Sequence, residues 1–109
     1  MEDSAFVGTK LKYAVNITAS GFDIARDDFE IDLCNGKNSL HFNKAELPYD
    51  TGGQYYLCFD SEKLGEGLVV AKVTAHVPDN DYPGGIRDEV DFIDLVYLKN
   101  GKNKWVASV

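Results

Sequence analysis

Apolar and polar residues alternate along most of this chain, and no other feature limits the possible folds as strongly. Between positions 10 and 18 the residues Leu11, Tyr13, Val15 and Ile17 are apolar, and most of their neighbours are polar. An alternation with period two is typical of a β-strand with one buried face, whereas helices repeat about every 3.6 residues. The same alternation predicts further strands at 29–34, 54–59, 68–77, 90–99 and 103–108.

An Asn-Gly pair at 35–36 lies between two alternating stretches. Asn-Gly is the preferred pair for a type I′ hairpin turn, because both central residues of that turn need a positive φ angle. A two-residue loop here gives a register in which apolar residues face apolar ones and polar residues face polar ones, which stabilises paired strands. The predicted pairs include Ile31 with Leu40, Phe29 with Phe42, and Glu30 with His41.

A second Asn-Gly pair, at 100–101, predicts another hairpin. It would place Val96 opposite Trp105 and Leu95 opposite Val106, so that both faces of the ribbon are apolar. We therefore expect this ribbon either to lie between two layers or to form part of an association surface.

Turn-forming residues collect between the predicted strands, at 47–53, 60–67 and 78–85. Short strands separated by such segments predict an all-β fold, an antiparallel β-sandwich of the immunoglobulin-like kind with six to seven strands. Residues 61–64 are long enough for one helical turn. Because chains of roughly 100–150 residues commonly fold around a single core, we expect one domain over 6–109, preceded by a disordered segment at 1–5.

The chain is acidic, with 18 Asp and Glu against 11 Lys and Arg among 109 residues and a formal charge of −7. Without a basic run, nucleic acid and anionic membranes are not expected as partners. The apolar runs are far shorter than the ~20 residues that span a bilayer, so no membrane insertion is expected. The first residues lack the features of a secretory signal, and both a cytoplasmic protein and a mature segment behind a new initiator Met remain open.

Clustered carboxylates raise the question of a metal site, because Ca²⁺ takes roughly six to eight oxygen ligands. The cluster at 79–91 does not match an EF-hand: counted from Asp79, Pro83 takes the place of one ligand and Val90 the place of the bidentate Glu. Asp and Asn are also common in turns, where their side chains bond to the backbone. We therefore predict solvated loops, with no metal and no cofactor.

The chain has two histidines, His41 and His76, and neither belongs to a Gly-x-Ser-x-Gly or His-Glu-x-x-His motif. We expect His41 to pair with Glu30 across the first hairpin. His76 is expected to point outward together with Lys72 and Thr74. The sequence therefore predicts a protein that is not an enzyme.

Cys34 and Cys58 are too few for a disulfide framework, and their separation does not match the Cys-x-x-Cys pattern of zinc or redox sites. A disulfide needs Cα atoms within about 7 Å, a distance that sequence spacing does not fix. Both a disulfide and two reduced thiols remain open.

Aromatic residues provide a candidate binding surface. Tyr49 and Tyr82 lie in predicted loops, Trp105 lies in the predicted last strand, and Asp79 and Asp81 precede Tyr82. Tyr and Trp rings anchor protein interfaces, and beside carboxylates they are also suited to stacking on sugar rings. We therefore take these five residues as candidate binding residues.

Several motifs give the chain a family resemblance, namely Gly21-Phe22-Asp23, the stretch 28–33, Phe59-Asp60-Ser61, and Leu64-Gly65-Glu66-Gly67. With them the chain resembles small conserved proteins of unknown function carried on conjugative transposons and prophages of gut anaerobes. The stretch 71–90 is also similar to the amino-terminal β-sandwich domains of phage baseplate and tail proteins. The resemblance implies a sandwich fold and a mobile-element setting, and it assigns no site residue.

These observations lead us to expect a non-enzymatic β-sandwich module that acts as an assembly, adhesion or protein-interaction component of a mobile genetic element. Its partner would be another protein or a second copy of the chain, bound at sheet edges and aromatic loops. The alternative is a carbohydrate-binding module that uses exposed Tyr and Trp rings with loop carboxylates.

Overall fold

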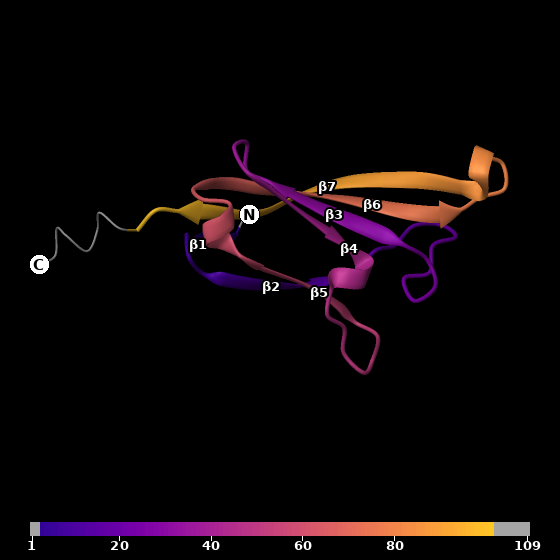
Figure 1. The fold of residues 1–109 in the computed structure, drawn as a ribbon, viewed down its shortest axis with the longest axis horizontal. Helices are drawn as coiled ribbons and strands as arrows, with labels where there is room; N and C mark the ends of the chain where they lie inside the picture. Colours follow the sequence, from indigo (N-terminus) through magenta and orange to yellow (C-terminus); the bar gives the residue numbers. More distant parts are fainter. Residues whose placement is uncertain (1–2, 102–109) are drawn as a thin grey trace, which may run out of the picture.

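A computed structural model describes residues 3–101 and shows an all-β chain of seven strands in two sheets. A five-stranded sheet with the order β1-β7-β6-β3-β4 lies over a two-stranded sheet of β2 and β5 (Figure 1). Within the described range the helical segments are three short 3-10 turns, η1 (Lys44–Glu46), η2 (Ser61–Lys63) and η3 (Pro83–Gly85). The strands are β1 (Asp3–Phe6), β2 (Lys10–Val15), β3 (Phe29–Cys34), β4 (Ser39–Asn43), β5 (Tyr55–Asp60), β6 (Gly67–Pro78) and β7 (Ile86–Lys99).

The hydrophobic core lies between the two sheets and follows from the alternation in the sequence. In β3 the side chains of Phe29, Ile31 and Leu33 are buried, while Glu30 and Asp32 between them are half-buried on the other face. Burial of each such apolar side chain contributes roughly 1.5–3 kcal/mol. The remaining core residues are Val15, Leu47, Leu57, Phe59, Leu64, Val69, Ala71, Val96 and Leu98.

Within residues 3–101 the predicted strands are confirmed, apart from their ends. The bounds of β3, β5 and β6 agree with the prediction within one residue, whereas β7 already begins at Ile86 and β2 already ends at Val15. The helical turn expected at 61–64 is η2. The strand predicted at 103–108 lies outside the described residues.

The first hairpin forms, but its register differs by two residues from the predicted one. Ile31 pairs with Phe42 rather than with Leu40, and His41 pairs with Asp32 rather than with Glu30. A shift of two residues keeps each side chain on its predicted face, because the faces of a strand alternate with period two. The predicted faces are therefore confirmed, while the predicted cross-strand partners are wrong.

The register shifts because Asn35 is the first residue of the turn and not one of its two central residues. Its side chain holds it in this position. Its Oδ1 accepts the amide hydrogen of Asn38 at 2.9 Å. Its Nδ2 donates to the carbonyl oxygens of residues 64–66, at distances of 2.6 to 3.3 Å. The central residues are therefore Gly36 and Lys37, and of these only Gly36 has a positive φ, 91°, as in a type II′ turn.

The second predicted hairpin is wrong in its pairing. Val96 lies between two other strands, since it pairs with Val69 of β6 on one side and with Asp3 of β1 on the other. Its predicted partner, Trp105, lies outside the described residues.

β1 is not predicted by the sequence pattern, and it changes the expected fold in two ways. It pairs in parallel with the last four residues of β7, so the prediction of a purely antiparallel sandwich is wrong at this edge and the five-stranded sheet is mixed. The described strands also begin inside the segment 1–5 that we expected to be disordered. A strand of four residues is too short for its alternation to stand out.

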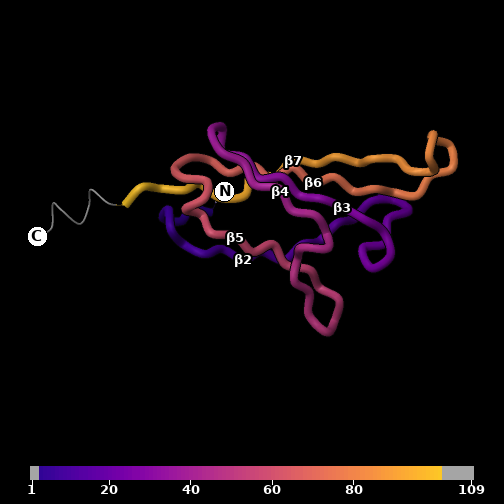
Figure 2. The backbone as a smooth tube through the Cα atoms, viewed as in Figure 1, coloured from indigo at the N-terminus to yellow at the C-terminus, as the bar shows by residue number. Residues whose placement is uncertain are grey.

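β6 and β7 form a long antiparallel hairpin that extends past the rest of the five-stranded sheet (Figure 1, Figure 2). β3 pairs with β6 only from Val70 to Ala75, and β1 pairs with β7 only from Val96 to Lys99. We call residues 76–95 the arm: along β6 they lie beyond the pairs with β3, and along β7 they lie before the pairs with β1. The arm carries the candidate site.

Candidate functional site

Residues 86–95 of β7 form an edge that no other strand among the described residues covers. β6 pairs with one side of this stretch, and β1 reaches the other side only from Val96 onward. An edge strand of this kind presents a row of unpaired backbone N–H and C=O groups. We call residues 86–95 the open edge.

The hydrogen bonds of β6 determine which residues of β7 direct backbone groups toward the open edge. The amide of His76 donates to the carbonyl oxygen of Asp28 at 3.0 Å, so even-numbered residues of β6 bond toward β3 and odd-numbered residues bond toward β7. In this part of the hairpin odd-numbered residues of β6 pair with odd-numbered residues of β7. The even-numbered residues of β7, among them Val90 and Phe92, therefore direct N–H and C=O away from β6.

The open edge exposes large apolar side chains on both faces of the strand. On the outer face, which points away from the core, Ile86, Val90 and Phe92 are 50%, 49% and 65% exposed. On the inner face Ile93 is 45% exposed. Contiguous exposed apolar side chains are typical of surfaces that bind another protein.

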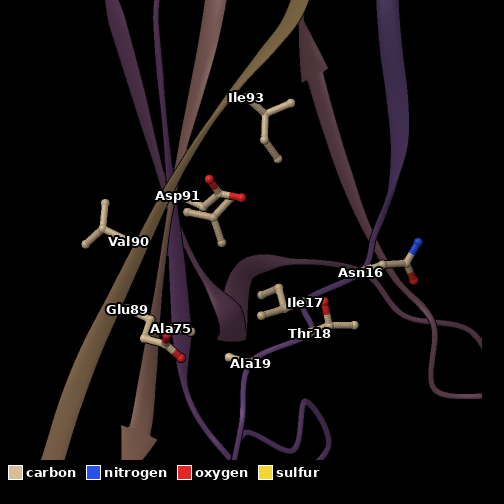
Figure 3. Close-up of a pocket in the computed structure, with 10 residues that line it drawn as sticks. Asn16, Ile17, Thr18, Ala19, Ala75, Glu89, Val90, Asp91 and Ile93 are labelled. Atoms are coloured by element: carbon tan, nitrogen blue, oxygen red, sulfur yellow. The ribbon is translucent and has the colours of Figure 1, made fainter.

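A groove of about 310 Å³ lies under the inner face of the open edge (Figure 3). One wall is the segment 16–19 that follows β2, and the other is formed by inward side chains of β6 and β7. Ile17 faces Ala75 and Asp91 across the groove, while Val90 points away from it on the other side of β7 (Figure 3). The groove is thus lined by apolar side chains, among them Ile17, Val73 and Ala75, and by the polar side chains of Asn16, Thr18, Glu89 and Asp91.

Carboxylates give the open edge a negative charge, because its ten residues hold one Arg and four Asp or Glu, a net charge of −3. Arg87 Nε lies 2.9 Å from Asp79 Oδ2, and its Nη1 lies 3.2 Å from Glu89 Oε2. The hydrogen bond to Asp79 is the main cause that raises the pKa of Arg87. Asp91 forms no ion pair with any residue that the structure describes.

A second polar cluster lies on the outer face of the five-stranded sheet, where two histidines and three carboxylates form a row across four strands. His76 Nδ1 lies 2.6 Å from Asp88 Oδ1, and its Nε2 lies 2.9 Å from Glu30 Oε2. His41 Nδ1 lies 2.6 Å from Asp32 Oδ1, and its Nε2 lies 3.8 Å from Glu30 Oε1. Glu30 therefore contacts both imidazoles.

These contacts favour the protonated form of both histidines. The hydrogen bond to Asp88 is the main cause that raises the pKa of His76, and Glu30 adds to it. The hydrogen bond to Asp32 is the main cause that raises the pKa of His41. The carboxylates of the row thus raise the pKa of both imidazoles and stabilise their protonated forms.

Three members of this row also have the arrangement of metal ligands, since donor atoms of Glu30, Asp32 and His41 lie within 4.8 Å of one another. One imidazole nitrogen and two carboxylate oxygens suit Zn²⁺ and related ions. Sequence reasoning did not bring these three residues together, because they come from two strands whose pairing sets their distance.

Three of the predicted binding residues, Asp79, Asp81 and Tyr82, share the turn between β6 and β7. The Asp79 carboxylate accepts the amide hydrogen of Asp81 at 3.0 Å and a hydrogen of Arg87 Nε at 2.9 Å. These bonds, that of Asp81 first, lower the pKa of Asp79. Tyr82 is 43% exposed. Asp79 therefore stabilises the turn, and Asp81 and Tyr82 are the members of the three that a ligand can reach.

The other two predicted binding residues do not join this turn. Tyr49 is 68% exposed in the loop between η1 and β5, where its ring centroid lies 5.2 Å from that of Tyr55. This loop projects from a different part of the molecule than the tip of the arm (Figure 2). Trp105 lies outside the described residues.

Cys34 and Cys58 are exposed thiols on β3 and β5, and they form no disulfide. Of the two possibilities left open by the sequence, the structure has the reduced pair.

Sequence reasoning missed the open edge, because it assigned 78–85 to a loop and began the following strand at residue 90. One signal was present in the sequence. Because side chains alternate between the two faces of a strand, Glu89 and Asp91 share a face with Ile93. Charged residues on the face that should be buried indicate that this part of a strand remains exposed.

Comparison with family models, with curated proteins and with solved structures finds no match to this chain. No helix within residues 3–101 is long and apolar enough to cross a membrane. We therefore infer the function from the geometry of the open edge.

Proposed function

We propose that this chain is a non-enzymatic protein-interaction module that binds an extended segment of a partner protein as an additional strand beside the open edge of β7. An added strand makes main-chain hydrogen bonds with the edge, and its side chains alternate between the two faces. The observation that carries the proposal is the length of the open edge, ten residues with β6 on one side and no described strand on the other.

The side chains of the open edge support the same proposal. Val90 and Phe92 on the outer face and Ile93 on the inner face are exposed, and a strand laid beside them would cover part of their apolar surface. Removing apolar surface from water contributes roughly 25 cal/mol per Å². The binding energy would thus come from main-chain hydrogen bonds and from apolar contacts together.

The proposal includes no catalytic role. The row of His41, Glu30 and His76 lies on a sheet face rather than in a cleft that could remove water from reacting groups. Its hydrogen bonds join neighbouring strands, which is a structural task.

The wider setting remains part of the proposal, namely an immunoglobulin-like sandwich that serves as an assembly or adhesion component of a mobile genetic element. Two sheets that share one core support the sandwich. A glycan site has less support, because Tyr49 and Tyr82 lie in separate loops and Asp79 is engaged by Arg87.

The test uses the backbone amide of Val90, which points to the open edge. Peptides of about ten residues, selected on the immobilised protein from a displayed random library, should protect the amides of Val90 and Phe92 from hydrogen exchange. Val90→Pro removes one edge donor without removing a bond to β6, and it should weaken binding roughly three- to ten-fold.

Val90→Ala is the matched control, because it shortens the same side chain and keeps the amide hydrogen. It should bind the selected peptides more tightly than Val90→Pro does. Selected peptides that leave the edge amides unprotected, or that bind Val90→Pro as tightly as Val90→Ala, would show that the proposal is wrong.

A further inference from the structure

The open edge also carries a pattern of charge that restricts its partner, and the inference that follows rests on the proposed function. We infer that the partner segment is an extended strand in which basic residues alternate with apolar ones, with Lys or Arg opposite Glu89 and Asp91 and apolar residues opposite Val90 and Phe92.

The pattern follows from the faces of β7. Glu89 and Asp91 pair with Ala75 and Val73 of β6 on the inner face, whereas Val90 lies between them on the outer face. Side chains directly opposite each other on neighbouring strands share a face and lie about 4.5–5.5 Å apart. Along residues 89–92, a strand added to β7 therefore meets carboxylates on the inner face and apolar side chains on the outer face.

The groove under the inner face suits a long basic side chain. Lys and Arg have an apolar stem and a charged end, and they bury the stem along apolar surface while the end stays hydrated. Ile17 and Ala75 line the groove, which has a volume of about 310 Å³, and the Asp91 carboxylate lies at its rim (Figure 3).

Asp91 is the stronger of the two determinants. Glu89 already has a cationic neighbour, since its Oε2 lies 3.2 Å from Nη1 of Arg87. The Asp91 carboxylate forms no ion pair within residues 3–101, so a partner's ammonium or guanidinium group has no internal cation to displace.

The same charges argue against a second copy of the chain as the added strand. In an antiparallel pair of two β7 strands centred on Val90, Glu89 of one copy lies opposite Asp91 of the other, and like charges in that position are destabilising. The net charge of −3 over the open edge opposes acidic partners in the same way. Charge complementarity thus selects a basic strand.

The inference is tested with three synthetic peptides of about ten residues, the length of the open edge. The first alternates Lys with Val, the second has the same composition with Lys and Val in two blocks, and the third alternates Glu with Val. The alternating Lys peptide should bind and protect the amides of Val90 and Phe92. The block peptide has the same charge but the wrong pattern, and it should bind roughly ten-fold more weakly.

Two double variants test whether the effect of charge on peptide affinity comes from Glu89 and Asp91. Glu89→Gln with Asp91→Asn should weaken binding of the alternating Lys peptide roughly five-fold, because exposed ion pairs contribute modestly. Glu62→Gln with Glu66→Gln removes the same charge at two exposed positions outside the arm, and it should change binding less than about two-fold.

Equal loss of affinity in the two double variants, or equally tight binding of the Glu and Lys peptides, would overturn the inference and leave the proposed function standing. If neither the designed peptides nor the library-selected ones protect the amides of the open edge, the proposed function fails as well.

Discussion

Across the arm, Nδ1 of His76 on β6 lies 2.6 Å from Oδ1 of Asp88 on β7. Nε2 of the same ring contacts Glu30 on β3 at 2.9 Å. One imidazole ring therefore joins three strands where β6 passes the end of β3. Because these contacts raise the pKa of His76, the stability of the arm is linked to the protonation of this ring.

The free energy of unfolding should fall as the pH rises above the ordinary pKa of histidine, 6.5. Asp88 and Glu30 raise the pKa of His76 in the folded protein. A group with a higher pKa in the folded state contributes fully below its unfolded pKa, and this contribution is lost as the pH rises through the folded value. Urea unfolding from about pH 5 to about pH 9 measures the effect.

His76→Gln should make this pH dependence shallower, because a neutral amide replaces the imidazolium. The remaining dependence should come in part from His41, whose pKa Asp32 raises in the same way. Curves of unfolding free energy against pH that run parallel in the wild type and in His76→Gln would contradict the link.

Asn35→Ala should lower the free energy of unfolding by about 1–3 kcal/mol. The variant removes the amide group that donates to the carbonyl oxygens of residues 64–66 and the Oδ1 that accepts from Asn38. Lys37→Ala, in the same turn and exposed, should stay within about 0.5 kcal/mol of the wild type. Equal losses in the two variants by urea unfolding would mean that Asn35 does not act through these bonds.

Leu98→Ala and Phe92→Ala should separate the two halves of β7. Leu98 is fully buried between the sheets, so its truncation should cost about 2–5 kcal/mol. Phe92 is larger but 65% exposed, and its truncation should change the free energy of unfolding by no more than about 0.5 kcal/mol. A cost at Phe92 similar to that at Leu98 would show that the open edge is packed in solution.

The strands could be predicted from local patterns, because burial of one face of a strand makes apolar and polar residues alternate in the sequence. Phe29, Ile31 and Leu33 show their face in the sequence, and the structure buries all three. The register of the first hairpin was not predictable in this way. It depends on bonds from Asn35 to residues 64–66, and the Asn-Gly pair alone does not reveal a contact between positions so far apart.

The candidate site was hard to predict for the same reason. Val90 and Val96 lie in one strand and look alike in sequence, yet Val96 has a strand on each side and Val90 has β6 alone among the described strands. Which neighbour covers an edge is decided by distant segments such as β1. The loop residues Tyr49 and Tyr82 can be identified from the sequence one residue at a time, whereas an open edge is a property of the whole sheet.

β1 and the end of β7 lie side by side and run in the same direction, and this arrangement determines how the protein carries tension. Force applied between Asp3 and Lys99 pulls the two strands in opposite directions along their common axis, so all four residue pairs are loaded in shear at once. A hairpin such as β6–β7, pulled at its two ends, would instead break its residue pairs one after another. If the protein is held through Asp3 and Lys99, the force therefore acts on the strand pair in shear, the geometry that resists force better. The lifetime of the fold under force would then be set by the rate at which this short parallel ladder breaks.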